Sequence, residues 1–251
     1  MTSLRLPILG GFLAAAATAA TGGDQGHHWS YAGKNGPSHW AEIDAHNAAC
    51  TGKSQSPIAI QSSEVRTATL PALEFHYRSA PLRIVDNGHT IQVNYEPGSS
   101  LSVGGKSYEL IQFHFHRPSE EIIDGKRFAM AAHLVHRDVQ GHLAVVAVPL
   151  SPGSDNMLVE TLWRNLPAEK EKEVSPPAVN INAAALLPAT LGYYTYTGSL
   201  TTPPCSEGVR WMVLKTPSPV SAREVNVFAT RYPNDARPVQ PLNGREVISS
   251  K

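Results

Sequence analysis

The sequence predicts a single domain built mainly from β-strands, with helices in a minor role, and three observations support this fold class. The chain has 251 residues, of which 41% are hydrophobic, and this suits one large globular domain. Short apolar segments recur along it, bounded by Pro, Gly, Asn and Asp, as expected for strands joined by turns. Segments with helical periodicity are few, and the sequence contains no internal repeat. We therefore expect a mainly β protein of the α+β class.

Nine segments have the length and composition of strands. They are residues 58–61, 73–77, 82–85, 90–95, 108–116, 129–136, 143–150, 193–197 and 209–214. Asp86, Asn87 and Gly88 lie between two of these segments, and an Asn-Gly pair between apolar runs indicates a hairpin turn. So many strands with short connections predict a sheet at the centre of the domain.

Helices are expected at two places. Asp155 can cap a helix over residues 156–164, whose apolar side chains fall at helical spacing. Ser221 can cap a second helix over residues 222–230. The polar, Pro-containing stretch 168–177 is expected to be a surface loop. Both helices are short, so they belong at the periphery of a sheet.

The amino-terminal residues have the pattern of a secretory signal peptide. A basic start that includes Arg5 precedes an apolar stretch over residues 6–17, and small residues suited to cleavage follow. The apolar stretch is too short and too interrupted by Gly for a bilayer-spanning helix. We expect residues 1–20 to be removed and residues 21–251 to form an exported domain, periplasmic or extracellular. A retained amino-terminal anchor stays open as the alternative.

Charge and cysteine content narrow the partners and the compartment. The chain has 21 acidic and 21 basic residues, so no net field attracts nucleic acid or a membrane surface, and a small or neutral substrate is favoured. Cys50 and Cys205 are its only cysteines. Export favours a disulfide between them, with two reduced and buried thiols as the alternative.

Three histidines are the candidate metal ligands. His114 and His116 are two residues apart on an expected strand, so both rings project from one face, while the intervening Phe115 points to the other. His133 follows on a second apolar segment. Three neutral imidazoles with an open fourth position suit a catalytic zinc ion, although ligand type alone does not exclude cobalt, iron or copper. The residues alone also leave open that these histidines are ordinary hydrogen-bonded boundary residues.

A series of motifs occurs in order across nearly the whole chain. They are His28-Trp29-Ser30-Tyr31, Asn35-Gly36-Pro37-Ser38-His39-Trp40, Gln55-Ser56-Pro57-Ile58, Asp86-Asn87-Gly88-His89, Gln112 through Glu120, His133-Leu134-Val135-His136, Gly198-Ser199-Leu200-Thr201-Thr202-Pro203-Pro204 and Arg237-Pro238-Val239-Gln240-Pro241-Leu242. In these motifs the chain resembles an alpha-class carbonic anhydrase of the exported bacterial type.

The resemblance implies a fold, a cofactor and an activity. The fold is a large twisted, mostly antiparallel central sheet with peripheral helices, and Cys50 pairs with Cys205 as in secreted members. The cofactor is zinc, held by His114, His116 and His133. The activity is the reversible hydration of carbon dioxide to bicarbonate and a proton, by attack of zinc-bound hydroxide. We expect no nucleic acid partner and, after signal cleavage, no membrane partner; assembly as a homodimer stays open.

The resemblance also assigns roles around the metal. Thr201 orients the hydroxide, Glu120 orients Thr201, and His89 is the proton shuttle. Gln112 shares a strand face with His114 and reaches its ring. Further positions match the proton path and the substrate pocket of the family. The residues that hold water on the proton path are Tyr31, Asn87 and Gln92, and the pocket residues are Val135, Val145, Leu200, Thr202 and Trp211.

The third ligand has an unusual environment. Many relatives carry a glutamate two residues before this histidine and a histidine after the Pro-Ser-Glu motif, but this sequence has Ala131 and Glu121 there. We expect a relocation in which Glu121 accepts the hydrogen bond from the ring of His133. The alternative is a solvated Glu121, with water orienting the ring. For His116 we expect a backbone carbonyl near Asn243 and Gly244 as the acceptor.

Two rival functions are weighed against the enzyme. A catalytically silent binding module of the same fold is disfavoured because all three candidate ligands are retained. A zinc esterase would use the same nucleophile, but no Ser-His-Asp or H-E-x-x-H arrangement supports a dedicated hydrolase.

Overall fold

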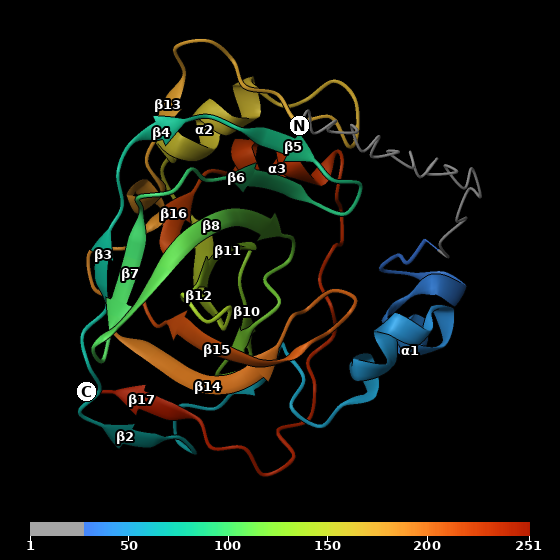
Figure 1. Ribbon diagram of the computed structural model, residues 1–251, viewed down its shortest axis with the longest axis vertical. Helices are drawn as coiled ribbons and strands as arrows, with labels where there is room; N and C mark the ends of the chain where they lie inside the picture. Colours follow the sequence, from blue (N-terminus) through green and yellow to red (C-terminus); the bar gives the residue numbers. More distant parts are fainter. Residues whose placement is uncertain (1–27) are drawn as a thin grey trace, which may run out of the picture.

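A computed structural model describes residues 28–251 of the chain, so the expected signal peptide lies outside the described residues. A single large sheet dominates these residues (Figure 1). Its twelve strands are β2 (Arg66–Ala68), β3 (Glu74–His76), β5 (Ile84–Asp86), β6 (Ile91–Asn94), β7 (Ser100–Val103), β8 (Lys106–His116), β11 (Met130–Arg137), β12 (Leu143–Pro152), β14 (Tyr193–Ser199), β15 (Glu207–Leu214), β16 (Ser218–Val220) and β17 (Ile248–Ser250).

The strand order of the sheet confirms the expected class. The main path runs β2-β17-β14-β15-β12-β11-β8-β6-β5, with β7 beside β8, β3 beside β7, and β16 beside β12. Most neighbouring strands are antiparallel, while β12 pairs in parallel with β15 and β16, and β17 in parallel with β2. The sheet is therefore mixed but mostly antiparallel, and β8, β11 and β12 lie near its middle.

Short elements surround the sheet. Two further small sheets are formed by β1 (Ala59–Ile60), β9 (Ile122–Ile123) and β10 (Lys126–Arg127), and by β4 (Ala80–Pro81) with β13 (Asn180–Ile181). The helices are η1 (Gly33–Asn35), η2 (Pro37–His39), α1 (Trp40–Ile43), η3 (Ala45–Thr51), α2 (Met157–Arg164), η4 (Ala183–Leu186) and α3 (Ala222–Ala229). Figure 1 shows α2 and α3 together beyond β5 and β6. None of the helices in residues 28–251 has the length and apolar character that a bilayer crossing requires.

The helix caps agree with the sequence at one helix and correct it at the other. Ser221 caps α3, and Glu224 completes a capping box with it. The cap of α2 is Asn156 rather than Asp155: the Asn156 side chain accepts hydrogen bonds from the backbone N–H groups of the first turn. Asp155 instead forms an ion pair with Arg223 at 3.5 Å. Both residue types are good caps, so the sequence alone does not separate two adjacent candidates.

All nine expected strand segments contain a strand, but their surroundings differ. Segment 58–61 yields only the two residues of β1, which lie outside the main sheet. The expected hairpin is present, with β5 and β6 antiparallel on either side of residues 87–90. The sequence did not indicate several strands of two to four residues, such as β16 and β17. Such short strands carry too little alternation to be recognised, because tertiary contacts decide them.

The two faces of the sheet carry separate apolar clusters. The larger cluster includes Phe113, Phe115 and Leu134 and packs toward α2 and α3. The smaller cluster includes Val135, Val145 and Trp211. Since side chains alternate along a strand, His114 and His133 lie on the face of the smaller cluster.

Candidate metal centre

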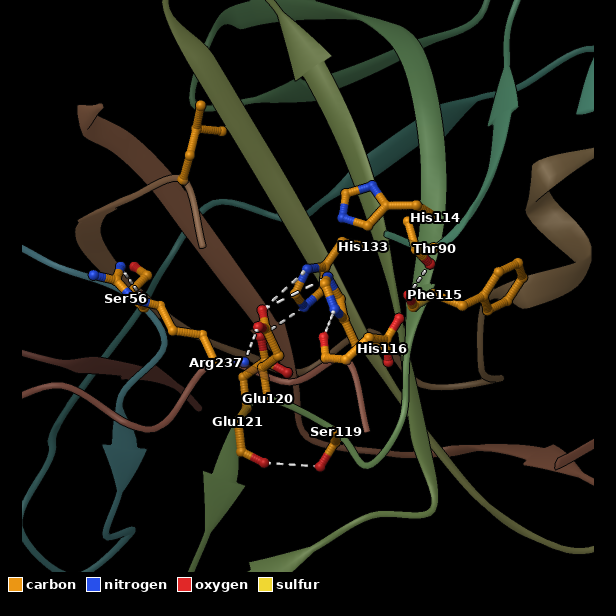
Figure 2. A network of polar contacts seen from close by, with 12 residues as sticks. Ser56, Thr90, His114, Phe115, His116, Ser119, Glu120, Glu121, His133 and Arg237 are labelled. Atoms are coloured by element: carbon orange, nitrogen blue, oxygen red, sulfur yellow. Dashed lines mark hydrogen bonds and ion pairs between the residues drawn. The ribbon is translucent and has the colours of Figure 1, made fainter. Parts of the chain in front are cut away.

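The register between β8 and β11 brings the three histidines together. His133 on β11 is directly opposite His114 on β8, and the next residue of β8 on the same face is His116. The ring centroids are 5.4 Å apart for His114 and His133, 5.0 Å for His114 and His116, and 4.7 Å for His116 and His133. Figure 2 shows these rings beside one another, with Glu120 and Glu121 close to them.

Each ring uses one nitrogen for a hydrogen bond to the protein. The Nδ1 atom of His114 lies 2.8 Å from Oε1 of Gln112. The Nδ1 atom of His116 lies 2.7 Å from the backbone oxygen of Asp235, and Nε2 of His133 lies 2.8 Å from Oε1 of Glu121. These acceptors fix which nitrogen of each ring keeps its lone pair free.

The free nitrogens form a suitable set of metal ligands. One ligand atom from each of the three rings lies within 4.8 Å of the other two, and this is the one such group in the described part of the chain. The Nε2 atom of His116 is buried and has no hydrogen-bond partner. A buried nitrogen without a partner is costly in a protein interior, and a cation at this point would satisfy it. Three imidazole nitrogens match zinc better than magnesium or calcium.

The charge states also favour a metal. Burial, and to a lesser extent the neighbouring His133, lower the pKa of His114 to about 3. Burial likewise holds the pKa of His116 well below its usual range. The pKa of His133 is raised overall, because Glu121 and then Glu120 outweigh the lowering effect of burial. Two of the three rings are therefore neutral at pH 7, as metal ligands must be.

The acceptor for His116 corrects the sequence prediction. The prediction that a carbonyl near Asn243 and Gly244 accepts from His116 was wrong. The acceptor is the carbonyl of Asp235. The segment around Asp235 runs beside the end of β8, since its backbone N–H donates to the carbonyl of Arg117 at 3.0 Å. The Asn243 side chain instead donates to the carbonyl of Lys53.

Glu120 lies fully buried beneath the rings. Its Oε2 atom is 3.7 Å from Nε2 of His116 and 3.9 Å from Nδ1 of His133, and its Oε1 atom accepts from the backbone N–H of Arg237 at 2.7 Å. Burial raises the pKa of Glu120 to about 7, against the lowering effects of His133 and of a hydrogen bond from the Thr201 side chain. A divalent cation at the rings would favour the ionised carboxylate further.

Thr201 lies in the turn after β14, and a disulfide anchors this turn. The predicted disulfide between Cys50 and Cys205 is confirmed, with Cα atoms 4.9 Å apart. The backbone N–H of Cys205 donates to the carbonyl of Thr202 at 2.8 Å, and the side chain of Gln55 donates to the carbonyl of Cys205 at 3.2 Å. The disulfide therefore ties the turn that carries Thr201 to the amino-terminal segment.

Two residues of the segment after α3 were not recognised as parts of the site. Asp235 supplies the carbonyl for His116, and Arg237 supplies the N–H for Glu120. The buried Arg237 guanidinium also donates to Gln55 Oε1 at 2.9 Å and to the Ser56 carbonyl at 2.8 Å. Arg237 belongs to one of the motifs that carry the family resemblance, but both contacts with the site use backbone atoms, for which residue type gives no signal.

Apolar side chains line the face beside the rings. Val135, Val145 and Trp211 belong to one buried cluster, and Leu200 packs against it. The ring of Trp211 meets that of His133 edge-on, with centroids 5.0 Å apart. Thr202 is partly buried in the turn after β14. The structure thus brings together most of the expected pocket residues next to the metal ligands.

The expected proton path is grouped around His89. The His89 ring stacks on Trp29 with centroids 3.6 Å apart. Burial lowers the pKa of His89 to about 4, helped by His28 and Lys170. The Asn87 side chain donates to Gln92 Oε1 at 3.3 Å.

Tyr31, the third residue expected to hold water on the proton path, lies beside the same stack. Its ring meets that of Trp29 edge-on, with centroids 5.3 Å apart. Its hydroxyl is buried and has no hydrogen-bond partner among the described residues. Burial, and then Glu120, hold the pKa of Tyr31 well above its usual range. The Tyr31 hydroxyl therefore stays protonated at neutral pH.

A large mixed sheet with three converging imidazoles defines a class of protein, a β-sheet metalloprotein with a three-histidine centre. A family model described as eukaryotic-type carbonic anhydrase matches residues 35–251. The carbonic anhydrase of Nostoc sp. is 42% identical over 227 residues, which cover 89% of this chain and 86% of that protein. The carbonic anhydrase of Neisseria gonorrhoeae is 41% identical over 249 residues, or 97% of each protein.

Solved structures agree with these matches. The complex of alpha-carbonic anhydrase from Thermovibrio ammonificans with the inhibitor sulfanilamide has a TM-score of 0.85 at 41% identity, covering 89% of this chain and 99% of that chain. Dioscorin complexed with ascorbate has a TM-score of 0.82 at 32% identity, covering 88% and 97%. The chain belongs to the eukaryotic-type, or alpha-class, carbonic anhydrase family.

Proposed function

We propose that this chain catalyses the reversible hydration of carbon dioxide to bicarbonate and a proton, with His114, His116 and His133 holding a zinc ion. The observation that carries the proposal is the set of three buried rings, each already hydrogen-bonded through its other nitrogen. When bound, zinc would supply a nucleophile at neutral pH by lowering the pKa of a water molecule from its ordinary, very high value to about 7, as is established for carbonic anhydrases as a family.

Glu120 and Thr201 give the nucleophile its direction. An ionised carboxylate only accepts hydrogen bonds, so Glu120 accepts the hydrogen bond that the Thr201 hydroxyl donates. The oxygen of Thr201 is then left to accept, and it holds the nucleophile in one orientation. The Oε1 atom of Glu120 also accepts from the backbone N–H of Arg237, which keeps the carboxylate from rotating. This arrangement favours attack by one lone pair over tumbling of the nucleophile.

Carbon dioxide, the proposed substrate, is uncharged, so its binding site should be apolar. Val135, Val145, Leu200 and Trp211 offer such a surface beside His133. These side chains also exclude water from the substrate. Thr202, in the adjoining turn, contacts the more polar product, bicarbonate.

His89 would receive the proton that the hydration of carbon dioxide releases, through waters held by Tyr31, Asn87 and Gln92. A ring stacked on Trp29 with a pKa of about 4 is a weak acceptor at neutral pH. A ring that leaves the stack regains water, and its pKa returns toward 6.5, which suits proton transfer. Replacing His89 by Ala should slow hydration in weak buffer, and added imidazole should restore the rate.

Compartment and partners follow from other features. We propose an exported protein, periplasmic or extracellular, whose residues 1–20 are a cleaved signal peptide, and the Cys50–Cys205 disulfide supports export. The equal numbers of acidic and basic residues support the absence of nucleic acid and membrane-surface partners. A homodimer is the assembly to test, by light scattering on the purified domain.

The decisive experiment is stopped-flow hydration of carbon dioxide by metal-free protein, before and after the addition of zinc. We expect little activity without zinc and full activity with one equivalent. Comparison with the rate on an activated ester separates this function from a dedicated zinc esterase, for which ester turnover would dominate. No hydration by protein with zinc shown to be bound would favour the silent binding module.

A further inference from the structure

The turn that carries His89 is held by side chains rather than by its own backbone alone. It connects the end of β5 at Asp86 to the start of β6 at Ile91. Oδ1 of Asn87 accepts from the backbone N–H groups of His89 at 3.0 Å and Thr90 at 2.9 Å. Oδ1 of Asp86 accepts from the N–H of Gly88 at 3.2 Å. Asp86 and Asn87 therefore set the path of the backbone at His89.

Asp86 also ties this turn to the end of α3. Its side chain is buried, with 1% of its surface exposed. Oδ2 accepts from Nη1 of Arg231 at 2.9 Å, and Oδ1 accepts a short hydrogen bond from the hydroxyl of Tyr232. A buried carboxylate is costly unless its oxygens are satisfied, so these three donors specify its position closely.

A third segment closes the same cluster. The backbone N–H of Glu171, in the loop at 168–177, donates to the carbonyl of Asp86 at 2.6 Å. Nζ of Lys170 in that loop lies over the ring of Tyr232, 5.7 Å from its centroid. The turn, the end of α3 and the loop thus meet at Asp86. None of the contacts described for this cluster involves a metal ligand or its hydrogen-bond acceptor.

We propose that Asp86 is a positioning residue for proton export. It fixes the turn so that the ring of His89 stays between the water near the metal and the solvent, where it takes and releases protons. This inference rests on the proposed function, and specifically on His89 as the proton carrier. Loss of the Asp86 contacts would let the turn move, which slows proton transfer but leaves the interconversion of carbon dioxide and bicarbonate untouched.

Exchange of ¹⁸O between carbon dioxide and water at chemical equilibrium tests the proposal, because it reports the interconversion rate and the proton-dependent release of labelled water separately. Asp86→Ala should lower the proton-dependent rate by roughly ten- to a hundredfold, because a catalytic group misplaced by about 1 Å can cost roughly a hundredfold in rate. Interconversion should stay unchanged within about twofold. Added imidazole should restore the lost rate, since it bypasses His89.

Matched variants guard against a purely structural effect. Asp86→Asn keeps an acceptor for Gly88 and Tyr232 but loses the one for Arg231. Its proton-dependent rate should therefore fall between those of the wild type and Asp86→Ala. Tyr232→Phe removes one of the donors to Asp86 and keeps the carboxylate. If Asp86→Ala does not fold, the proton-dependent rate of Tyr232→Phe tests the proposal instead. Glu173→Ala is the control: it removes contacts to Arg83 and Asn94 of the same hairpin and should leave both rates unchanged.

His89→Ala separates this inference from the proposed function. If His89→Ala slows proton release but the Asp86 variants do not, the positioning role is overturned while the shuttle stands. If His89→Ala has no effect, the shuttle itself fails, and the inference with it. An equal fall of both rates in Asp86→Ala would show a general structural role and overturn the proposal. If the variant that combines Asp86→Ala with His89→Ala releases protons no more slowly than His89→Ala alone, the result supports the proposal.

Discussion

At the scale of single residues, each ligand histidine divides its two nitrogens between the metal and the protein. Glu121 is the most distinctive of the three acceptors, because it follows Glu120 directly and both side chains are fully buried. Its counterpart in many relatives would come from the position of Ala131, which pairs with His116 across β8 and β11 and has only a methyl group. The carboxylate at Glu121 reaches the same ring from the loop after β8.

We expect Glu121→Ala to weaken zinc binding by roughly 10–100-fold, the usual effect of removing an acceptor from a ligand histidine. Competition with a chromophoric chelator measures the affinity without relying on activity. Introducing Ala131→Glu into the same variant should recover part of the affinity. Unchanged zinc affinity in Glu121→Ala would mean that water orients His133 instead.

Trp29 controls the acidity of His89. Its stacked ring removes water from one face of the imidazole, and burial disfavours the charged form, so the pKa of His89 is lowered to about 4. Trp29→Ala should therefore raise this pKa toward 6.5, as followed by NMR titration of the His89 ring protons. His28→Ala should raise it by less, since the charge of His28 is a smaller cause than burial. A pKa still near 4 without Trp29 would contradict the assignment of the cause.

At the scale of elements, the disulfide holds the turn that carries Thr201 and Thr202. Cys50 and Cys205 are separated by 155 residues. The loop-closure model assigns roughly 5 kcal/mol to a bond of this span, and measured losses are usually about 2–5 kcal/mol. Replacing both cysteines by Ser should lower the free energy of unfolding by such an amount, as measured in urea. Reduced wild-type protein is the control and should behave alike; a stable reduced protein would point to damage from the substitutions themselves.

A buried histidine on β11 should make the domain sensitive to acid. The ring of His136 is fully buried, donates to the carbonyl of Ala144 and accepts from the hydroxyl of Tyr77, and burial lowers its pKa to about 4. The unfolded chain takes up this proton near pH 6.5, whereas the folded protein does not until about pH 4. Stability is therefore present above pH 6.5 and is lost as the pH falls through this window.

We expect the full loss from His136 to be roughly 3 kcal/mol. Urea unfolding of metal-free wild type and His136→Gln at pH 7.5 and pH 5 measures it. The variant should lose less stability between the two values, whatever its stability at pH 7.5. Equal losses would assign the acid sensitivity to other groups, such as His114 and His116 in the absence of zinc.

At the scale of the whole molecule, the sequence predicted which side chains form the site better than it predicted which backbone groups hold them. The period-2 spacing of His114 and His116 predicted that these two rings share one face, and the family resemblance added His133 as the third ligand. Glu121 was recognisable because it departs from a known pattern. The carbonyl of Asp235 and the N–H of Arg237 were not, since every residue has these groups and only the tertiary path decides which of them reaches the site.

The strands of the sheet also differ in how far the sequence predicts them. Long strands such as β8, β11 and β12 are recognisable by composition, and they form the centre of the molecule. Short strands such as β2 and β17 exist because the chain passes beside an edge, so their own residues contain little information about them. At the cap of α2, two neighbouring residues are both suitable for one position, and the sequence alone does not predict which of them occupies it.

The acceptor for His116 comes from a residue 119 positions further along the chain, and this distance governs when the centre becomes complete. A chain that emerges amino-terminus first presents all three ligand rings long before Asp235 and Arg237 follow. Until that later segment has docked, His116 has no fixed ring orientation and Glu120 has no fixed rotamer. This last segment therefore has to dock before the three rings are oriented for a metal, although it contributes no ligand of its own.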